Sequence, residues 1–196
     1  MEYYLAVLAF TFVAGVTPGP NNIMLFSSGV NHGVKKSIPH YLGICFGFPL
    51  MVAAVGFGMG NVFRKFPEIH VIIQVLGVVY LLFLSWKIAN AGQASETSNI
   101  SAPLTFFQAT LFQWINPKAW VIAIGAISTY TLPDNVTQSI IWIIIAYFLM
   151  GFLAMGIWLF FGSILQNLLK DEKINHFFNW AMALLLVLSI FPMILS

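Results

Sequence analysis

The chain has 196 residues, of which 60% are hydrophobic and only 7% are charged. A soluble domain carries roughly 25% charged residues because its surface faces water, so this composition excludes a soluble protein. The formal net charge is +2 and the eight basic residues are scattered singly or in pairs, which excludes a nucleic-acid-binding surface.

Long runs without charge, separated by short charged stretches, predict the membrane-spanning helices. A spanning helix needs about 20 consecutive apolar residues. We therefore predict an all-α polytopic membrane protein, embedded in the lipid bilayer as one transport domain over residues 1–196. Its six transmembrane helices are expected at Tyr4–Ser27, Ile38–Gly60, Ile69–Ile88, Leu104–Ser128, Gln138–Leu165 and Asn175–Leu195.

A single polar stretch divides the predicted helices into two sets of three. This linker covers about residues 91–103, so the halves cover about 1–90 and 104–196. Three spans is an odd number, so the second half must enter the membrane upside down relative to the first. The sequence thus predicts a 3+3 inverted repeat, an architecture common among secondary transporters.

Lysine and arginine are unequally shared between the loops and predict the orientation. The first, third and fifth loops hold five of these residues, against two in the second and fourth. Basic loops remain cytoplasmic, so we predict a multi-pass protein of the cell inner membrane with its N- and C-termini in the periplasm.

The first span is interrupted by the motif Thr17-Pro18-Gly19-Pro20-Asn21-Asn22. Pro18 and Pro20 have no N–H, so the carbonyls of Ala14 and Val16 lose their helical partners. Unpaired backbone groups cost several kcal/mol each in hydrocarbon and are tolerated where they line a cavity. A broken helix is therefore predicted here.

The fourth span is interrupted in the same way by Asn116-Pro117-Lys118, which frees the carbonyl of Gln113. Lys118 lies near the middle of this span, where a cation costs about 2.5–3.5 kcal/mol on insertion scales. Matching breaks in two halves of a transporter mark a central solute site. The residues predicted to bind the solute are Thr17, Pro18, Gly19, Pro20, Asn21, Asn22, Gln113, Asn116, Pro117 and Lys118.

The chemistry of two such breaks suits a zwitterion. Each exposes a helix N-terminus that favours an anion, and Lys118 adds a positive charge, so a carboxylate is expected there. The freed carbonyls of Ala14, Val16 and Gln113, with the side-chain oxygens of the three asparagines, suit an ammonium group. No Asp or Glu lies in a predicted span, which favours a small neutral amino acid over a dication.

Two pairs of glycines in the second span permit close helix packing. Gly43 and Gly47, and likewise Gly56 and Gly60, are spaced so that each pair shares one helix face. Packing within one chain is the expectation, and packing between two copies in a homodimer is the alternative.

These motifs resemble those of the LysE/RhtB amino-acid exporters. The resemblance is carried by Thr17–Asn22, His32-Gly33 and Asn116–Lys118, and covers the chain in length, span number and break positions. Similarity is greatest to the cysteine/O-acetylserine exporter branch, through Ser27-Ser28, Trp86–Ala89 and Leu132-Pro133. The resemblance implies efflux of a small amino acid, driven by an ion gradient.

Other functions remain as alternatives. The protein could carry another small solute, such as homoserine, threonine, leucine or a metal ion, but the spans hold one cysteine and no carboxylate to bind a metal. No His-Glu-x-x-His motif or embedded acid supports an enzyme, so no catalytic residue, metal or cofactor is expected. His40, Glu68 and His70 lie near span ends and are interpreted as interfacial residues rather than proton relays.

Overall fold

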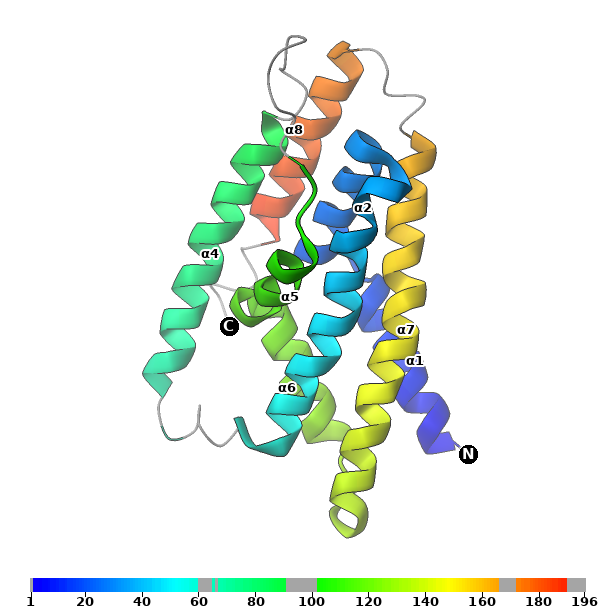
Figure 1. Ribbon diagram of the computed structural model, residues 1–196. Coiled ribbons are helices and arrows are strands. Elements are labelled where there is room, and N and C mark those ends of the chain that lie inside the picture. Colours follow the sequence, from blue (N-terminus) through cyan, green and yellow to red (C-terminus); the bar gives the residue numbers. More distant parts are fainter. Residues whose placement is uncertain (1, 60–64, 66, 91–101, 166–171, 190–196) are drawn as a thin grey trace.

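The computed structural model describes residues 2–59, 65, 67–90, 102–165 and 172–189. These residues form an elongated helical bundle without strands in the described part (Figure 1). Its helices are α1 (Glu2–Val16), α2 (Pro20–Ala54), the π-helix η1 (Val55–Met59), α4 (Pro67–Ala89), α5 (Phe106–Ile115), α6 (Pro117–Tyr130), the 3₁₀-helix η2 (Pro133–Asn135), α7 (Val136–Leu165) and α8 (Glu172–Leu188).

The long helix α2 contains a sharp reversal that separates the first two spans. Gly33 within it has φ 74° and ψ 174°, a backbone conformation that glycine adopts at little steric cost. The hydroxyls of Ser28 and Ser37 lie 2.7 Å apart, although nine residues of continuous helix would separate them by roughly 13.5 Å. The chain therefore folds back at Gly33, as Figure 1 shows.

With this reversal, the described helices cross the bundle six times, which confirms the predicted all-α transmembrane architecture. α1 and the start of α2 form the first pass, the rest of α2 with η1 the second, and α4 the third. α5 and α6 together form the fourth pass, α7 the fifth and α8 the sixth. The inverted relation of the halves stays a prediction, and the linker over 91–101 lies outside the described residues.

The outer surface of the bundle is apolar, as a bilayer requires. Along α7, exposed side chains recur every fourth residue, at Ile141, Ile145, Leu149, Leu153, Ile157 and Phe161. In a soluble helix this stripe would be polar because it would face water. The opposite face of α7 is also apolar, with Ile143, Ala146 and Ala154 fully buried against neighbouring helices.

Glycines bring α2 close to α5 and α7. A Cβ at Gly43 would overlap the backbone of Phe106, and one at Gly47 would lie 2.7 Å from Cα of Thr110, so both glycines face α5 of the same chain. This agrees with the expected packing within one chain. A homodimer stays a prediction and would have to use a different face, while Gly60 lies outside the described residues.

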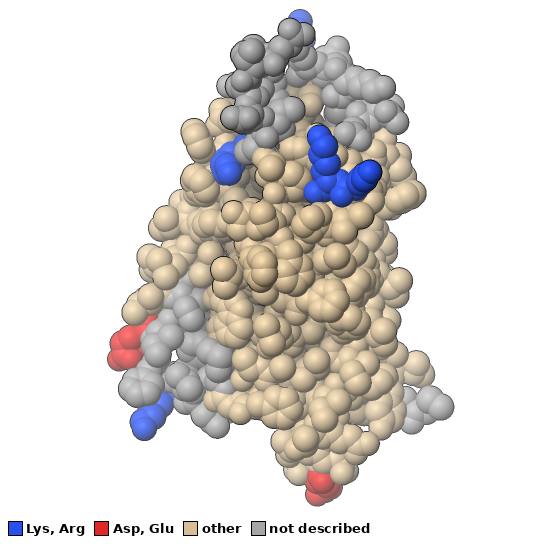
Figure 2. All heavy atoms as spheres, in the orientation of Figure 1, with Lys and Arg blue, Asp and Glu red and all other residues tan. Residues whose placement is uncertain are grey.

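Charged side chains gather at the two ends of the bundle (Figure 2). Lys35 and Lys36 follow the reversal of α2, Lys87 lies in the last turn of α4, and Lys173 lies in the first turn of α8. These segments share one end of the bundle in Figure 1, which we call the lysine-rich end. The opposite end, where α1 begins, carries Glu2, Lys65, Glu68 and Asp134.

Candidate functional site

The two predicted helix breaks contact each other in the middle of the bundle. Lys118 at the second break donates hydrogen bonds from Nζ to the carbonyls of Thr17 at 2.6 Å and Pro18 at 3.1 Å. The amides of Asn21 and Gln113 pair reciprocally, with Asn21 Nδ2 2.8 Å from Gln113 Oε1 and Gln113 Nε2 3.2 Å from Asn21 Oδ1. Segments about 100 residues apart in sequence thus build one site.

Several carbonyls at the first break are satisfied by side chains. Asn22 donates from Nδ2 to the carbonyl of Gly15 at 2.7 Å, and the indole of Trp158 on α7 donates to that of Val16 at 3.1 Å. The Val16 carbonyl, which was expected to hold a solute ammonium group, thus already accepts one hydrogen bond and retains a single lone pair. Pro18 has no N–H to donate to the carbonyl of Ala14. Ala14 lines the adjoining cavity.

The second break lies at Asn116, between α5 and α6. Asn116 has the extended conformation (φ −88°, ψ 105°), and its carbonyl accepts the N–H of Ala119 to start α6. The N–H of Asn116 itself bonds to the carbonyl of Gln113 at 3.3 Å, so this carbonyl already has one partner. The indole of Trp120 donates to the carbonyl of Trp114 at 2.9 Å and braces the break.

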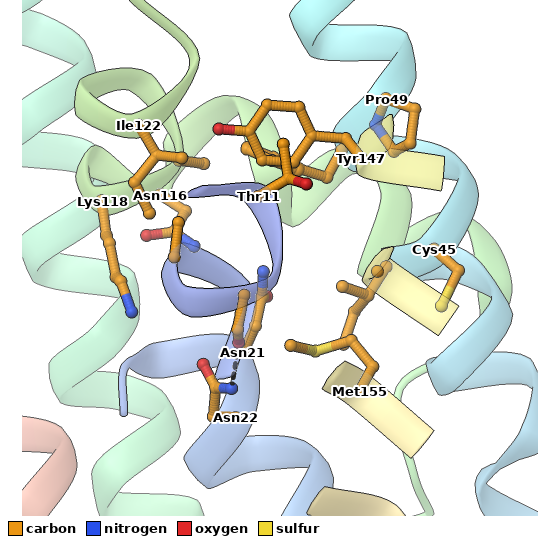
Figure 3. A pocket seen from close by; sticks show the side chains of 16 residues that line it. Thr11, Asn21, Asn22, Cys45, Pro49, Asn116, Lys118, Ile122, Tyr147 and Met155 are labelled. Carbon is orange, nitrogen blue, oxygen red and sulfur yellow. Dashed lines mark hydrogen bonds between the residues drawn. The ribbon is translucent and has the colours of Figure 1, made fainter. Parts of the chain in front are cut away.

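A cavity of about 560 Å³, including its open part, adjoins both breaks. Figure 3 shows Lys118 and Asn116 on one side of it and Cys45 and Met155 on the other. Its lining consists of Thr11, Ala14, Gly15, Asn21, Asn22, Ile44, Cys45, Phe48, Pro49, Asn116, Lys118, Ala119, Ile122, Tyr147, Gly151 and Met155. We call it the central cavity.

Two polar atoms at this cavity have no hydrogen-bond partner among the described residues. Asn116 is 2% exposed and Tyr147 is 3% exposed, yet neither Asn116 Oδ1 nor the Tyr147 hydroxyl is paired. Asn116 occupies the N-cap position of α6 without making the usual side-chain cap. Buried polar groups are nearly always satisfied, so these two are poised for a ligand.

The Lys118 ammonium reaches the first break because residue 19 has no side chain. A Cβ at Gly19 would lie 2.6 Å from Lys118 Cδ and 2.7 Å from its Nζ. An ammonium has three N–H donors. The carbonyls of Thr17 and Pro18 accept from this ammonium, which leaves donor capacity toward the cavity that Lys118 also lines.

The predicted site residues divide into two groups by position. Asn21, Asn22, Asn116 and Lys118 line the central cavity. The others build its frame: the Thr17 and Pro18 carbonyls hold the lysine, Gly19 admits it, and Pro20 and Pro117 begin α2 and α6. Gln113 is fully buried and braces Asn21.

Tyr147 and Pro49 both line the cavity, and neither was predicted from the sequence as a site residue. Pro49 lies inside α2, where it removes the helical partner of the Cys45 carbonyl, so a proline within the second span was the available signal. Tyr147 gave no signal, because a tyrosine in an apolar run has many structural roles.

His40, interpreted from the sequence as an interfacial residue, is buried within the bundle rather than exposed on its surface. Its side chain is only 2% exposed, and neither ring nitrogen has a partner among the described residues. The reversal at Gly33, seven residues earlier, allows helix α2 to carry His40 into the bundle. The side chains of the described residues form no cluster of three or more His, Cys, Asp or Glu that could hold a metal ion.

Comparison of the sequence with known proteins identifies the family of the chain. The family model for LysE type translocators matches residues 12–191. A cysteine/O-acetylserine efflux protein of Klebsiella pneumoniae is 32% identical over 188 residues, covering 93% of this chain and 92% of the relative. Proteins of the same name from Salmonella choleraesuis and Escherichia coli K12 are 31% and 28% identical over the same shares. No solved structure matches the chain.

Proposed function

The chain belongs to the LysE family of translocators, and we propose that it exports a small neutral amino acid or derivative through the central cavity. As a member of this family it is a multi-pass inner-membrane transport protein and not an enzyme. The resemblance found in the sequence is thereby confirmed. The single observation that carries the proposal is the meeting of both helix breaks, with Lys118, at one cavity.

The cavity offers separate partners for the two charges of an amino acid. The Lys118 ammonium and the N-termini of α2 and α6 favour a carboxylate at the breaks. The unpaired Asn116 Oδ1 and the Tyr147 hydroxyl oxygen are acceptors for the amine. No Asp or Glu lies among the lining residues, so a second positive charge on the solute would have no counter-ion.

Cysteine and O-acetylserine are the proposed solutes because the relatives carry these names. The walls support a side chain of modest polarity, since Ile44, Cys45 and Met155 complete the lining opposite the breaks. Homoserine, threonine and leucine have the same charged groups and remain the competing solutes. The polar contacts proposed here address the groups that all of them share.

We propose that transport is secondary-active and directed outward, with the lysine-rich end in the cytoplasm. Basic residues near span ends are retained on the cytoplasmic side, which supports this orientation. Both chain termini would then lie in the periplasm. The central cavity is lined by the end of α1 and the start of α6, together with Asn21 and Asn22 in the first turn of α2.

Proteoliposomes loaded with labelled amino acids test the function. Cysteine, O-acetylserine, homoserine, threonine, leucine and lysine are loaded in turn, and their exit is followed with and without a pH gradient. We expect exit of the first two to exceed that from empty liposomes and to change with the gradient, while lysine is retained. Exit of none of these amino acids would contradict amino-acid export, and exit of metal ions instead would support the alternative.

Filling the cavity is expected to block transport without disturbing the fold. A Cβ at Gly151 meets nothing within 4 Å, and this glycine lines the cavity. Gly151→Phe should therefore lower the export rate by more than tenfold, while the melting temperature stays near that of the wild type. The matched control is Gly125→Phe, because Gly125 also has open space at its Cβ but does not line the cavity. Equal export by both variants would place the route elsewhere.

Cys45, the single cysteine of the chain, reports solute binding directly. It lines the central cavity and is otherwise buried, so a small thiol reagent must enter the cavity to reach it. We expect saturating O-acetylserine, which has no thiol, to slow the labelling of Cys45 in purified protein. An unchanged labelling rate, measured by mass spectrometry under conditions that support transport, would contradict binding at this cavity.

A further inference from the structure

A second cavity, of about 500 Å³ including its open part, lies toward the lysine-rich end of the bundle. It is bounded by the start of α2, the last turns of α4 and the segment that precedes α5. Its lining consists of Met24, Ser27, Ser28, Asn31, His32, His40, Leu84, Lys87, Ile88, Ala102, Pro103 and Leu104. None of these residues lines the central cavity, so the two spaces are distinct.

His40 is the residue of this cavity whose polar atoms have no hydrogen-bond partner among the described residues. Its ring lines the space, yet neither Nδ1 nor Nε2 is paired and the residue is only 2% exposed. A neutral imidazole has one donor and one acceptor nitrogen. A buried polar group without partners costs about 1–3 kcal/mol, so the ring is better explained by a ligand than by packing.

The charge around this cavity favours an anion. Lys87 lines it, and its Nζ lies 5.5 Å from the centre of the Phe83 ring. No Asp or Glu is among the lining residues. The remaining polar side chains are the imidazole of His32 and neutral hydroxyls and amides, with Asn31 bonded to the Ser27 carbonyl at 2.9 Å and Ser28 to Ser37. Among the described residues of the lining, a carboxylate therefore finds a cation and no negative charge.

We propose that this second cavity is a separate binding site for a zwitterionic amino acid on the lysine-rich side of the helix breaks. Lys87 attracts the carboxylate, and His40 forms hydrogen bonds with the polar groups at the other end of the solute. The inference rests on the proposed function, because it assigns the solute of the central cavity a second site.

The two sites are separated by a short stretch of α2. Asn21 lines the central cavity and Met24 lines the second one, three residues or roughly 4.5 Å further along the helix axis. The reciprocal amide pair of Asn21 and Gln113 lies in this stretch. A solute that passes from the second cavity to the central one must therefore cross the region that this pair bridges.

Thiol protection tests the site without measuring transport. In a Cys45→Ala background, Ser27→Cys places the only thiol on the wall of the second cavity, and Ser163→Cys places it on α7 outside both cavities. We expect O-acetylserine to slow labelling of the Ser27→Cys protein by more than threefold and to leave the Ser163→Cys protein unchanged. Ethanolamine, which lacks a carboxylate, should protect neither. No protection at position 27, or equal protection by ethanolamine, would overturn the proposal.

Kinetics of His40 variants provide the second test. His40→Leu removes both ring nitrogens at similar size and should raise the KM for export about tenfold, the effect of losing one hydrogen bond. His40→Gln keeps a donor and an acceptor and should stay within about threefold of the wild type. A KM for His40→Leu equal to that of the wild type would overturn the second site and leave export through the central cavity intact. A wild type that exports no amino acid would instead contradict the proposed function.

Discussion

Replacing Lys118 with methionine is expected to abolish amino-acid export while the protein remains folded in the membrane. The substitution keeps an unbranched side chain but removes the ammonium that contacts the Thr17 and Pro18 carbonyls and lines the central cavity. The carboxylate of the solute would lose its cation. Export by Lys118→Met should fall at least a hundredfold in proteoliposomes that contain equal amounts of protein.

Two opposing effects keep the stability of this variant near that of the wild type. Loss of the hydrogen bonds leaves two carbonyls without the lysine, at a cost of about 1–3 kcal/mol each if they stay dry. Removing a cation from mid-membrane recovers about 2.5–3.5 kcal/mol. Lys36→Met is the control, because Lys36 is exposed and lines neither cavity. Normal export by Lys118→Met, or equal losses in both variants, would remove Lys118 from the site.

The Gly77→Ala substitution is expected to destabilise the protein strongly, although residue 77 lines no described cavity. A Cβ at this position of α4 would overlap the carbonyl of Ile115 and lie 3.0 Å from Cδ of Pro117. Both groups belong to the break between α5 and α6, where backbone has little room to move. Overpacking of this kind costs typically 1–3 kcal/mol, so the melting temperature in detergent should fall measurably.

Gly125→Ala provides the comparison for this effect. Its Cβ would have nothing within 4 Å, so the same substitution in α6 meets no obstacle. Alanine favours a helix interior over glycine by roughly 0.5–1 kcal/mol, and we expect Gly125→Ala to be neutral or slightly stabilising. Melting temperatures that fall equally in both variants would show that the close contact of α4 with the break does not make residue 77 more sensitive to substitution than residue 125.

The sequence predicted the helices and their breaks well because both have local causes. Uncharged runs determine which segments can lie in lipid, and Pro18, Pro20 and Pro117 lack the N–H that a continuous helix needs. The cost of a cation within a span also indicated that Lys118 would find polar partners. These arguments need only neighbours in the chain, and the structure agrees with them.

Partners from distant helices could not be predicted in this way. Trp158 satisfies the Val16 carbonyl from 142 residues away, and a tryptophan in an apolar span gives no indication of that contact. The same limit applies to the Asn21–Gln113 pair, whose members were each assigned to the solute rather than to one another. The number of hydrogen bonds that a side chain can form is known from the residue type, whereas the partners that it bonds to depend on the fold.

His40 illustrates a different limit. Its place near the start of a hydrophobic run did not reveal that the side chain is buried, because burial depends on the helices that pack against α2 after the reversal at Gly33. The reversal at Gly33 lies within residues 28–37, which the predicted spans leave as the first connection, but the partners that its sharp turn brings together could not be predicted. The second cavity was consequently not predicted from the sequence.

The contact between Lys118 and the first break also has a consequence for biosynthesis. The lysine follows its acceptor carbonyls by 101 and 100 residues in the chain. At translation rates of about 5–20 residues per second, Thr17 and Pro18 leave the ribosome roughly 5–20 s before their partner exists. During this interval the two carbonyls lack the ammonium that they contact in the complete protein.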